Sequence, residues 1–171
     1  MARADVFDLA SLSLVAGEGR KLDLEVSLDE ISFSGQAYEI EPDVVPVRID
    51  IAKMMGEGWS LRLRFAASLT GPCMRCLIDA RPLFEIDARE IDQPGGGEDL
   101  DSPYVNEAQE LDVRSWAHDA FALALPAQIL CREDCAGLCP VCGADLNEDP
   151  GHEHEPEPDP RWAALRDLKL D

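Results

Sequence analysis

The feature that most constrains the fold is a period of two in the hydrophobic pattern of the first half of the chain. Apolar residues alternate with polar ones over 22–28, 45–51 and 61–69, and a shorter stretch at 84–88 repeats the pattern. Such alternation, rich in β-branched and other apolar side chains, is typical of half-buried β-strands. Because no helical stretch separates these strands, the sequence predicts an antiparallel sheet or a small barrel-like core.

One main helix is predicted after the strands. Asp112 is a favourable N-cap, and the apolar residues that follow recur at helical spacing until Pro126, which ends or kinks the helix. The break at 93–106, with three consecutive glycines at 95–97, is predicted to be a flexible acidic loop. The predicted fold class is therefore α+β, with an antiparallel β-sheet or small barrel-like core covered by one helix.

The chain of 171 residues has the length of one domain. Residues 1–130 are predicted to form the β-rich core with its covering helix. Residues 131–171 are predicted to add, within the same structural unit, a cysteine knuckle, an acidic C-terminal arm and a short C-terminal helix. The arm, 145–159, carries seven acidic residues and no Lys or Arg, and the helix begins at Pro160 with Trp162, Leu165 and Leu168 on one face.

The charge of the chain restricts its partners. Asp and Glu number 35 against 15 Lys and Arg, a formal net charge of −20. Such a surface repels phosphate, which disfavours direct binding to bare nucleic acid and favours a basic protein or a cation as the partner. We expect no membrane partner, because no apolar run approaches the ~20 residues that span a bilayer. Asp5 and Asp8 interrupt any signal-like segment, so the expected localisation is cytoplasmic, where thiols stay reduced.

Six cysteines and two histidines are the candidate metal ligands. They form two CxxC pairs, a third cysteine pair and a histidine pair: Cys73 and Cys76, Cys139 and Cys142, Cys131 and Cys135, His152 and His154. Clustered cysteines in a reducing compartment favour structural zinc over disulfides. The two CxxC pairs are compatible with one shared ion, and so are the four cysteines between 131 and 142. Eight ligands suffice for two complete sites, and spacing alone does not choose among these arrangements. Unligated reduced cysteines and solvated histidines are the alternative.

The chain is not expected to be an enzyme. It has no P-loop, no dinucleotide fingerprint and no G-x-S-x-G nucleophile. Neither CxxC opens a helix after a strand, as a thioredoxin-like motif would. No catalytic and no organic cofactor-binding residues are predicted. Arg48, Arg62 and Arg64 form either a small basic stripe on the outer face of the sheet or ordinary cross-strand pairs with carboxylates.

Several motifs together resemble one family. They are Cys73-x-x-Cys76, a helix ending in Leu-Ala-Leu-Pro, the string from Leu138 to Asn147 (LCPVCGADLN), and Asp159-Pro160-Arg161-Trp162. The chain resembles the YceD family, the large-ribosomal-RNA-subunit accumulation proteins of bacteria and plastids, from about Val45 to its end. At the position where other members carry a further cysteine pair, this chain has His152-Glu153-His154, which favours the histidines as ligands.

The resemblance implies a cytoplasmic, non-catalytic factor in ribosome biogenesis that supports accumulation or processing of large-subunit ribosomal RNA. With the net charge, it suggests an adaptor or chaperone that reaches the large-subunit precursor through basic ribosomal or RNA-processing proteins. One or two structural zinc ions are expected. The alternative is a zinc-stapled protein-interaction module that binds a basic partner and is unrelated to ribosomes.

Overall fold

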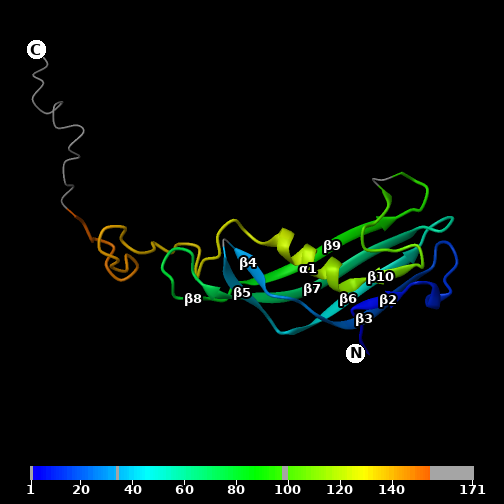
Figure 1. Ribbon diagram of the computed structural model, residues 1–171, viewed down its shortest axis with the longest axis horizontal. Helices are drawn as coiled ribbons and strands as arrows, with labels where there is room; N and C mark the ends of the chain where they lie inside the picture. Colours follow the sequence, from blue (N-terminus) through cyan, green and yellow to red (C-terminus); the bar gives the residue numbers. More distant parts are fainter. Residues whose placement is uncertain (1, 34, 98–99, 155–171) are drawn as a thin grey trace, which may run out of the picture.

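The computed structural model describes residues 2–33, 35–97 and 100–154, and Figure 1 shows their arrangement. The C-terminal helix predicted from Pro160, and the acidic arm beyond residue 154, lie outside the described residues. The elements in chain order are β1 (Ala2–Arg3), β2 (Val6–Asp8), a short 3-10 helix (Ala10–Leu12), β3 (Gly19–Ser27), β4 (Ile31–Phe33), β5 (Gln36–Glu41), β6 (Val44–Lys53), β7 (Trp59–Pro72), β8 (Asp79–Ala80), β9 (Leu83–Asp92), β10 (Glu110–Asp112) and α1 (Val113–Ala124).

The long strand β7 organises the main sheet. On one edge it pairs antiparallel with β9 over residues 59–68. On the other edge it pairs with β6 through residues 59–64 and with β5 through residues 68–70, so β5 and β6 act as one interrupted strand. Strand β3 continues the sheet beyond β6. The four stretches predicted from alternation thus correspond to β3, β6, β7 and β9, and their antiparallel pairing is confirmed.

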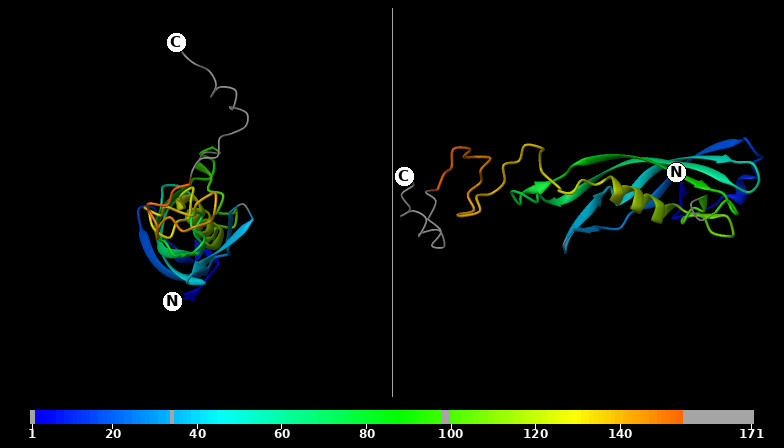
Figure 2. Two further views of the ribbon diagram at one scale, coloured as in Figure 1. Left: turned by 90° about the vertical axis from the view of Figure 1, so that its left-hand side faces the viewer. Right: turned by 90° about the horizontal axis from the view of Figure 1, so that it is seen from above.

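The pairings at the edges add to the predicted sheet. Strand β1 pairs parallel with β3, so the sheet is not wholly antiparallel. Strand β2 pairs with β10 in a separate two-stranded sheet. Among the described residues β9 pairs with β7 alone and β1 with β3 alone, so the sheet is open. Seen along its length it is curved, with α1 on its concave side (Figure 2).

The helix α1 begins and ends where the sequence predicts. Asp112 accepts a hydrogen bond from the backbone N–H of Ser115 at 2.9 Å, and Leu125 is extended ahead of Pro126. The helix buries four side chains against the sheet: Val113, Trp116, Ala117 and Phe121. Phe121 packs against Phe65 of β7 and Phe84 of β9. This contact fixes the helix across the concave face, in agreement with an α+β fold.

The segment before the helix is not the free loop that the sequence predicts. Ser102 is buried, and its backbone N–H donates to Asp92 at 3.2 Å. Tyr104 stacks on Trp116, with ring centroids 6.2 Å apart. The sequence predicts a flexible acidic loop at 93–106, but these two contacts fold the described part of the segment back onto the end of the sheet.

The outer face of the sheet carries charge pairs. The arginines of the predicted stripe are each matched with an aspartate on a neighbouring strand: Arg48 with Asp23, Arg62 with Asp87 and Arg64 with Asp50. The Arg62 guanidinium lowers the pKa of Asp87, mainly by hydrogen bonding to it. Cross-strand pairing, and not a free basic stripe, is therefore the arrangement of this face.

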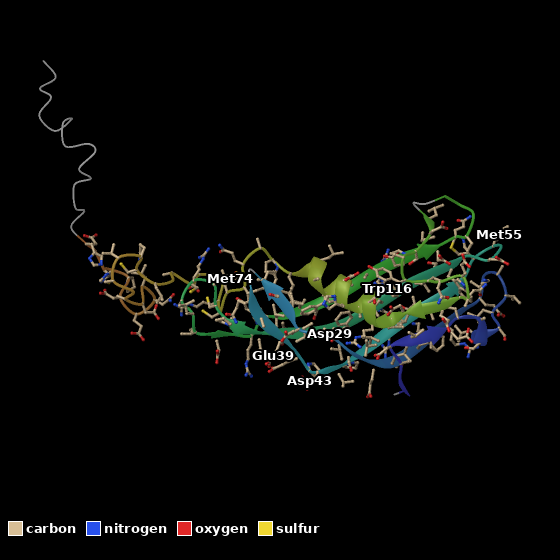
Figure 3. The ribbon with its side chains drawn as sticks, in the orientation of Figure 1. Asp29, Glu39, Asp43, Met55, Met74 and Trp116 are labelled. Atoms are coloured by element: carbon tan, nitrogen blue, oxygen red, sulfur yellow. The ribbon has the colours of Figure 1, made fainter. Side chains whose placement is uncertain are left out.

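The cysteine-containing segment, residues 131–154, lies beyond one end of the sheet (Figure 1). Met55, before β7, and Met74, after it, lie toward opposite ends of the sheet (Figure 3). Residues 131–154 extend beyond the Met74 end (Figure 1). Within the described part of the chain, α1 is too short to cross a bilayer, and no other helix there is a candidate.

Candidate metal centres

The first CxxC forms the turn between β7 and β8. The backbone N–H of Cys73 donates to the carbonyl of Ile78 at 2.7 Å, and the N–H of Leu77 donates back to the carbonyl of Cys73 at 3.0 Å. Leu77 closes the turn with φ +64°, in the left-handed region. These bonds turn Cys73 and Cys76 to one side of a tight loop, as metal knuckles require.

The second CxxC repeats this turn with a different closing residue. The N–H of Cys139 donates to the carbonyl of Ala144 at 2.8 Å, and the N–H of Gly143 donates to the carbonyl of Cys139 at 2.8 Å. Gly143 has φ +76°. It occupies the position that Leu77 holds in the first turn, where glycine is the residue that avoids strain. Two segments far apart in sequence therefore form the same knuckle.

The first knuckle is fixed to the sheet. Gly71 lies so close to Tyr38 of β5 that a Cβ at residue 71 would sit 2.3 Å from the tyrosine ring. The Tyr38 hydroxyl donates to the carbonyl of Pro72 at 2.8 Å. Because residues 71 and 72 lead directly into Cys73, these contacts hold the knuckle at the end of the core.

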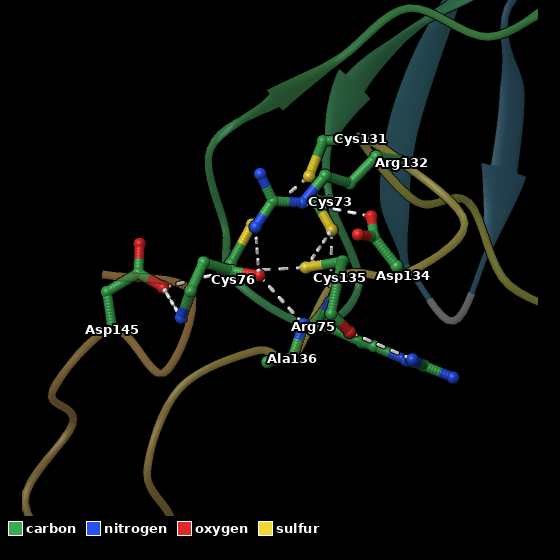
Figure 4. A network of polar contacts seen from close by, with 10 residues as sticks. Cys73, Arg75, Cys76, Cys131, Arg132, Asp134, Cys135, Ala136 and Asp145 are labelled. Carbon is green, nitrogen blue, oxygen red and sulfur yellow. Dashed lines mark hydrogen bonds and ion pairs between the residues drawn. The ribbon is translucent and has the colours of Figure 1, made fainter. Parts of the chain in front are cut away.

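The segment after α1 brings two further cysteines to this knuckle. The N–H of Met74 donates to the carbonyl of the fully buried Ile129 at 2.8 Å. Arg75 donates to the side chain of Gln128 at 3.3 Å and to the carbonyl of Cys135 at 2.9 Å. The chain between these anchors contains Cys131 and Cys135, which therefore face the first CxxC (Figure 4).

The first centre comprises Cys73, Cys76, Cys131 and Cys135, whose sulfurs all lie within 4.8 Å of one another. The Sγ atoms of Cys73 and Cys135 are 3.8 Å apart, and those of Cys76 and Cys131 are 3.6 Å apart. A tetrahedral zinc with bonds of about 2.3 Å would separate its sulfurs by roughly 3.8 Å. All four cysteines are reduced in the structure. These two separations match those expected around one tetrahedral ion.

The second centre comprises Cys139, Cys142, His152 and His154, again with all ligand atoms within 4.8 Å. The Sγ of Cys142 lies 3.1 Å from Nε2 of His152 and 3.3 Å from Nε2 of His154. The two Nε2 atoms are 2.9 Å apart. For zinc–nitrogen bonds of about 2.0–2.1 Å the expected separation is roughly 3.3 Å, so the arrangement is slightly tighter than a filled site.

The thiol pKa values follow the knuckle geometry. In the first knuckle burial raises the pKa of Cys73, but backbone N–H groups of Cys76, Arg75 and Cys131 outweigh it and lower the pKa to about 6. In the second, the N–H groups of Cys142 and Val141 lower the pKa of Cys139 to about 6. Each knuckle thus favours a thiolate, the form that binds metal, at its first cysteine.

Two further cysteines of the first centre, Cys76 and Cys131, behave in the opposite way. Burial, followed by hydrogen bonding to Cys76, raises the pKa of Cys131 to about 12. Burial also raises the pKa of Cys76. Four thiolates packed this closely repel one another unless a cation lies among them. The first centre could therefore hold a divalent cation that takes soft sulfur ligands, such as zinc.

The structure brings together all eight residues singled out in the sequence, in two groups of four. Neither grouping considered from spacing is the one observed: the two CxxC pairs lie in different centres, and Cys131 and Cys135 join Cys73 and Cys76. The residues that sequence reasoning missed are Arg75 and Asn147, which contact the centres without being ligand types. No pattern in the sequence marks their role, although both lie inside the motifs.

Comparison with known proteins places these centres in a family. The family described as large ribosomal RNA subunit accumulation protein YceD matches residues 61–169. All eight candidate ligands lie inside the matched region. No solved protein structure matches the chain.

The relatives found are bacterial proteins described as uncharacterised. The protein Rv2926c of Mycobacterium tuberculosis is 34% identical over 119 residues, which cover 67% of this chain and 57% of the relative. A Mycobacterium bovis protein, Mb2951c, matches to the same extent. YlbN of Bacillus subtilis is 28% identical over 156 residues, covering 86% of this chain and 87% of the relative. The match thus spans little more than half the length of the mycobacterial relatives.

Proposed function

Because the chain belongs to the YceD family of large ribosomal RNA subunit accumulation proteins, we propose that it supports the accumulation or processing of large-subunit ribosomal RNA. The proposed role is non-catalytic and cytoplasmic, that of an adaptor or chaperone in ribosome biogenesis. The observation that carries the proposal is the family match over residues 61–169, which includes β7, β9, α1 and both metal centres.

The charge of the chain supports contact through protein instead of naked RNA. The formal net charge is −20. Arg48, Arg62 and Arg64 on the outer sheet face are already paired with aspartates, which leaves them little charge to offer to phosphate. From Glu133 to His154 the chain has six acidic residues and no Lys or Arg. Such a surface complements basic ribosomal or RNA-processing proteins bound to the large-subunit precursor.

The ligand sets support structural zinc. In each centre the protein supplies four ligand side chains, whereas catalytic zinc keeps a position open for water or substrate. Three of the four cysteines in the first centre are buried, which leaves a substrate little access. We therefore propose one zinc ion per centre, each holding chain segments together and neither taking part in a reaction.

Affinity purification of the tagged full chain from cells, with and without ribonuclease, tests this function. We expect large-subunit proteins and precursor RNA to co-purify, and the proteins to remain after ribonuclease. Loss of all ribosomal proteins on ribonuclease treatment would contradict the protein-mediated contact. Recovery of a basic partner with no ribosomal material would favour an interaction module unrelated to ribosomes.

A variant with Glu133 and Glu148 replaced by Lys sharpens the test. Both residues are exposed within the acidic stretch 133–154 and are not candidate ligands. If the acidic surface binds basic proteins, this charge reversal will reduce their recovery while zinc content by native mass spectrometry stays at two ions. The matched control reverses Glu25 and Asp43 to Lys. It makes the same change in charge away from the cysteine segment and is expected to retain the partners.

A further inference from the structure

We infer that the two metal centres form one coupled unit, in which filling the second centre strengthens metal binding at the first through the side chain of Asn147. The inference rests on the zinc binding proposed above. Asn147 lies in the loop between Cys142 and His152, so it belongs to the second centre by sequence. Its side chain, however, contacts the segment that carries Cys135 of the first centre.

Three hydrogen bonds define this contact. The amide nitrogen Nδ2 of Asn147 donates to Sγ of Cys135 at 3.7 Å. The amide oxygen Oδ1 accepts from the backbone N–H of Ala136 at 2.8 Å and from the guanidinium of Arg132 at 2.7 Å. Because both of these partners are donors, the oxygen must face them, and the nitrogen is left facing the sulfur.

Asn147 is held in this orientation by its own loop. One carboxylate oxygen of Asp145 accepts from the backbone N–H of Asn147 at 2.8 Å and from its Nδ2 at 2.7 Å. The N–H of Leu146 donates to the carbonyl of Gly137 at 3.0 Å. The loop starts at Cys142 and ends at His152, which are both candidate ligands of the second centre. An ion there therefore closes the loop that presents Asn147.

Arg75 connects the centres from the other side. Its carbonyl accepts a hydrogen bond from Leu138, the residue before Cys139, at 3.2 Å. Gly137 approaches it so closely that a Cβ there would lie 3.1 Å from the same carbonyl. Figure 4 shows Arg75 beside Cys73, Cys76 and Cys135. The segment that leads into the second knuckle, residues 137–138, thus packs against the backbone of the first.

A hydrogen bond to a ligating sulfur delocalises its negative charge and fixes its direction. Removing such a bond lowers metal affinity by about 10- to 100-fold in known sites. Because coupling between two binding sites is reciprocal, the first ion must favour the second by the same factor. The arrangement therefore predicts positive cooperativity between two structural zinc ions.

The test measures the affinity of the first centre in the full chain by competition with a chromophoric chelator. Cobalt(II) is the probe, since four-thiolate and two-thiolate, two-imidazole centres have different visible spectra. Asn147→Asp keeps the shape and the acceptor oxygen of the side chain but replaces the N–H donor by a carboxylate oxygen. Asn147→Ala removes both groups. Glu148→Gln, an exposed change on the same loop, is the control.

We expect both Asn147 variants to lower first-centre affinity by about 10- to 100-fold, with Glu148→Gln unchanged. The double variant Cys139→Ser/Cys142→Ser, which removes the second ion, should lower first-centre affinity by a similar factor, and adding Asn147→Ala to it should have little further effect. His154→Ala provides the same test if the double variant does not fold. First-centre affinity within twofold of the unaltered chain after loss of the second ion would overturn the coupling. Failure of the unaltered chain to bind any ion would instead contradict the zinc proposal itself.

Discussion

The two metal centres share one local turn but differ in what surrounds them. In the first, Cys73, Cys76 and Cys135 are at most 4% exposed and belong to the hydrophobic core. In the second, Cys142 and His154 are exposed. The first centre is fixed to the sheet through Tyr38 and Ile129, whereas the second is hydrogen-bonded to the first through Asn147. The same knuckle therefore serves as part of the core in one place and as an appendage in the other.

This difference implies that the position of the second centre depends on the first centre. The described hydrogen bonds that tie residues 136–154 to the preceding chain run to Arg75, Arg132 and Cys135, all at the first centre. Loss of the first centre should therefore release the second, while loss of the second leaves the first in place with weaker binding. Similar motifs need not contribute equally to the stability of the fold, because their contributions depend on tertiary contacts.

The largest effect is expected from Cys73→Ser. Cys73 is fully buried between the sheet and the three other cysteines of its centre. The change removes one of four ligands, so we expect the free energy of unfolding to fall by roughly 3–5 kcal/mol. Denaturant unfolding followed by circular dichroism measures this loss. Native mass spectrometry should show fewer than two zinc ions per chain, and retention of two would contradict Cys73 as a ligand of the first centre.

Gly71→Ala should disturb the first centre without changing a ligand. The added methyl group would overlap the ring of Tyr38, and overpacking of this kind costs about 2 kcal/mol. Its counterpart in the second knuckle is Gly143→Ala, where no atom lies within 4 Å of the added Cβ but φ is +76°. That change should cost about 1 kcal/mol locally and leave the unfolding of the sheet unchanged. Equal effects of the two variants on the sheet would remove the distinction between core and appendage.

Cys142→Ser should remove one ion and destabilise the sheet less than Cys73→Ser does. Cys142 is exposed, and its centre contacts the remainder of the described chain at the first centre. With zinc in excess, we expect the free energy of unfolding of the sheet to fall by roughly 1–3 kcal/mol, because a 10- to 100-fold weaker first centre loses that much linked binding energy. Hydrogen exchange should rise far more within 136–154 than in β6 and β7. An equal rise in those two strands would show that the second centre supports the core directly.

The sequence predicts much of this framework but not the pairing of its ligands. Alternation identifies β6 and β7 because one face of each is buried, and Asp112 marks the start of α1 because its carboxylate caps the helix. Strand β5 escapes notice because its buried pair, Tyr38 and Ile40, is too short to establish a period. Strand β1 escapes notice because only its pairing with the distant strand β3 identifies it as a strand.

The grouping of the cysteines depends on distance in space. Cys131 reaches Cys76 across 55 positions because Ile129 pairs with the turn after β7. That contact follows from the packing of α1 on the sheet, which no local spacing records. The eight candidate ligands could therefore be identified from residue type in the sequence. Their division into two centres could be seen only in the folded structure.

The smallest expected effect concerns the closing position of the turn, where the first knuckle has leucine and the second has glycine. Leu77 adopts φ +64° although its side chain is 67% exposed, so little buried contact offsets a strain of about 1 kcal/mol. Leu77→Gly should relieve that strain, and the greater freedom of glycine in the unfolded chain offsets part of the gain. We expect a net stabilisation of about 0.5 kcal/mol, measured by denaturant unfolding with zinc in excess. Destabilisation by Leu77→Gly would mean that the leucine side chain itself contributes at the first centre, and the two turns would then be alike in hydrogen bonding only.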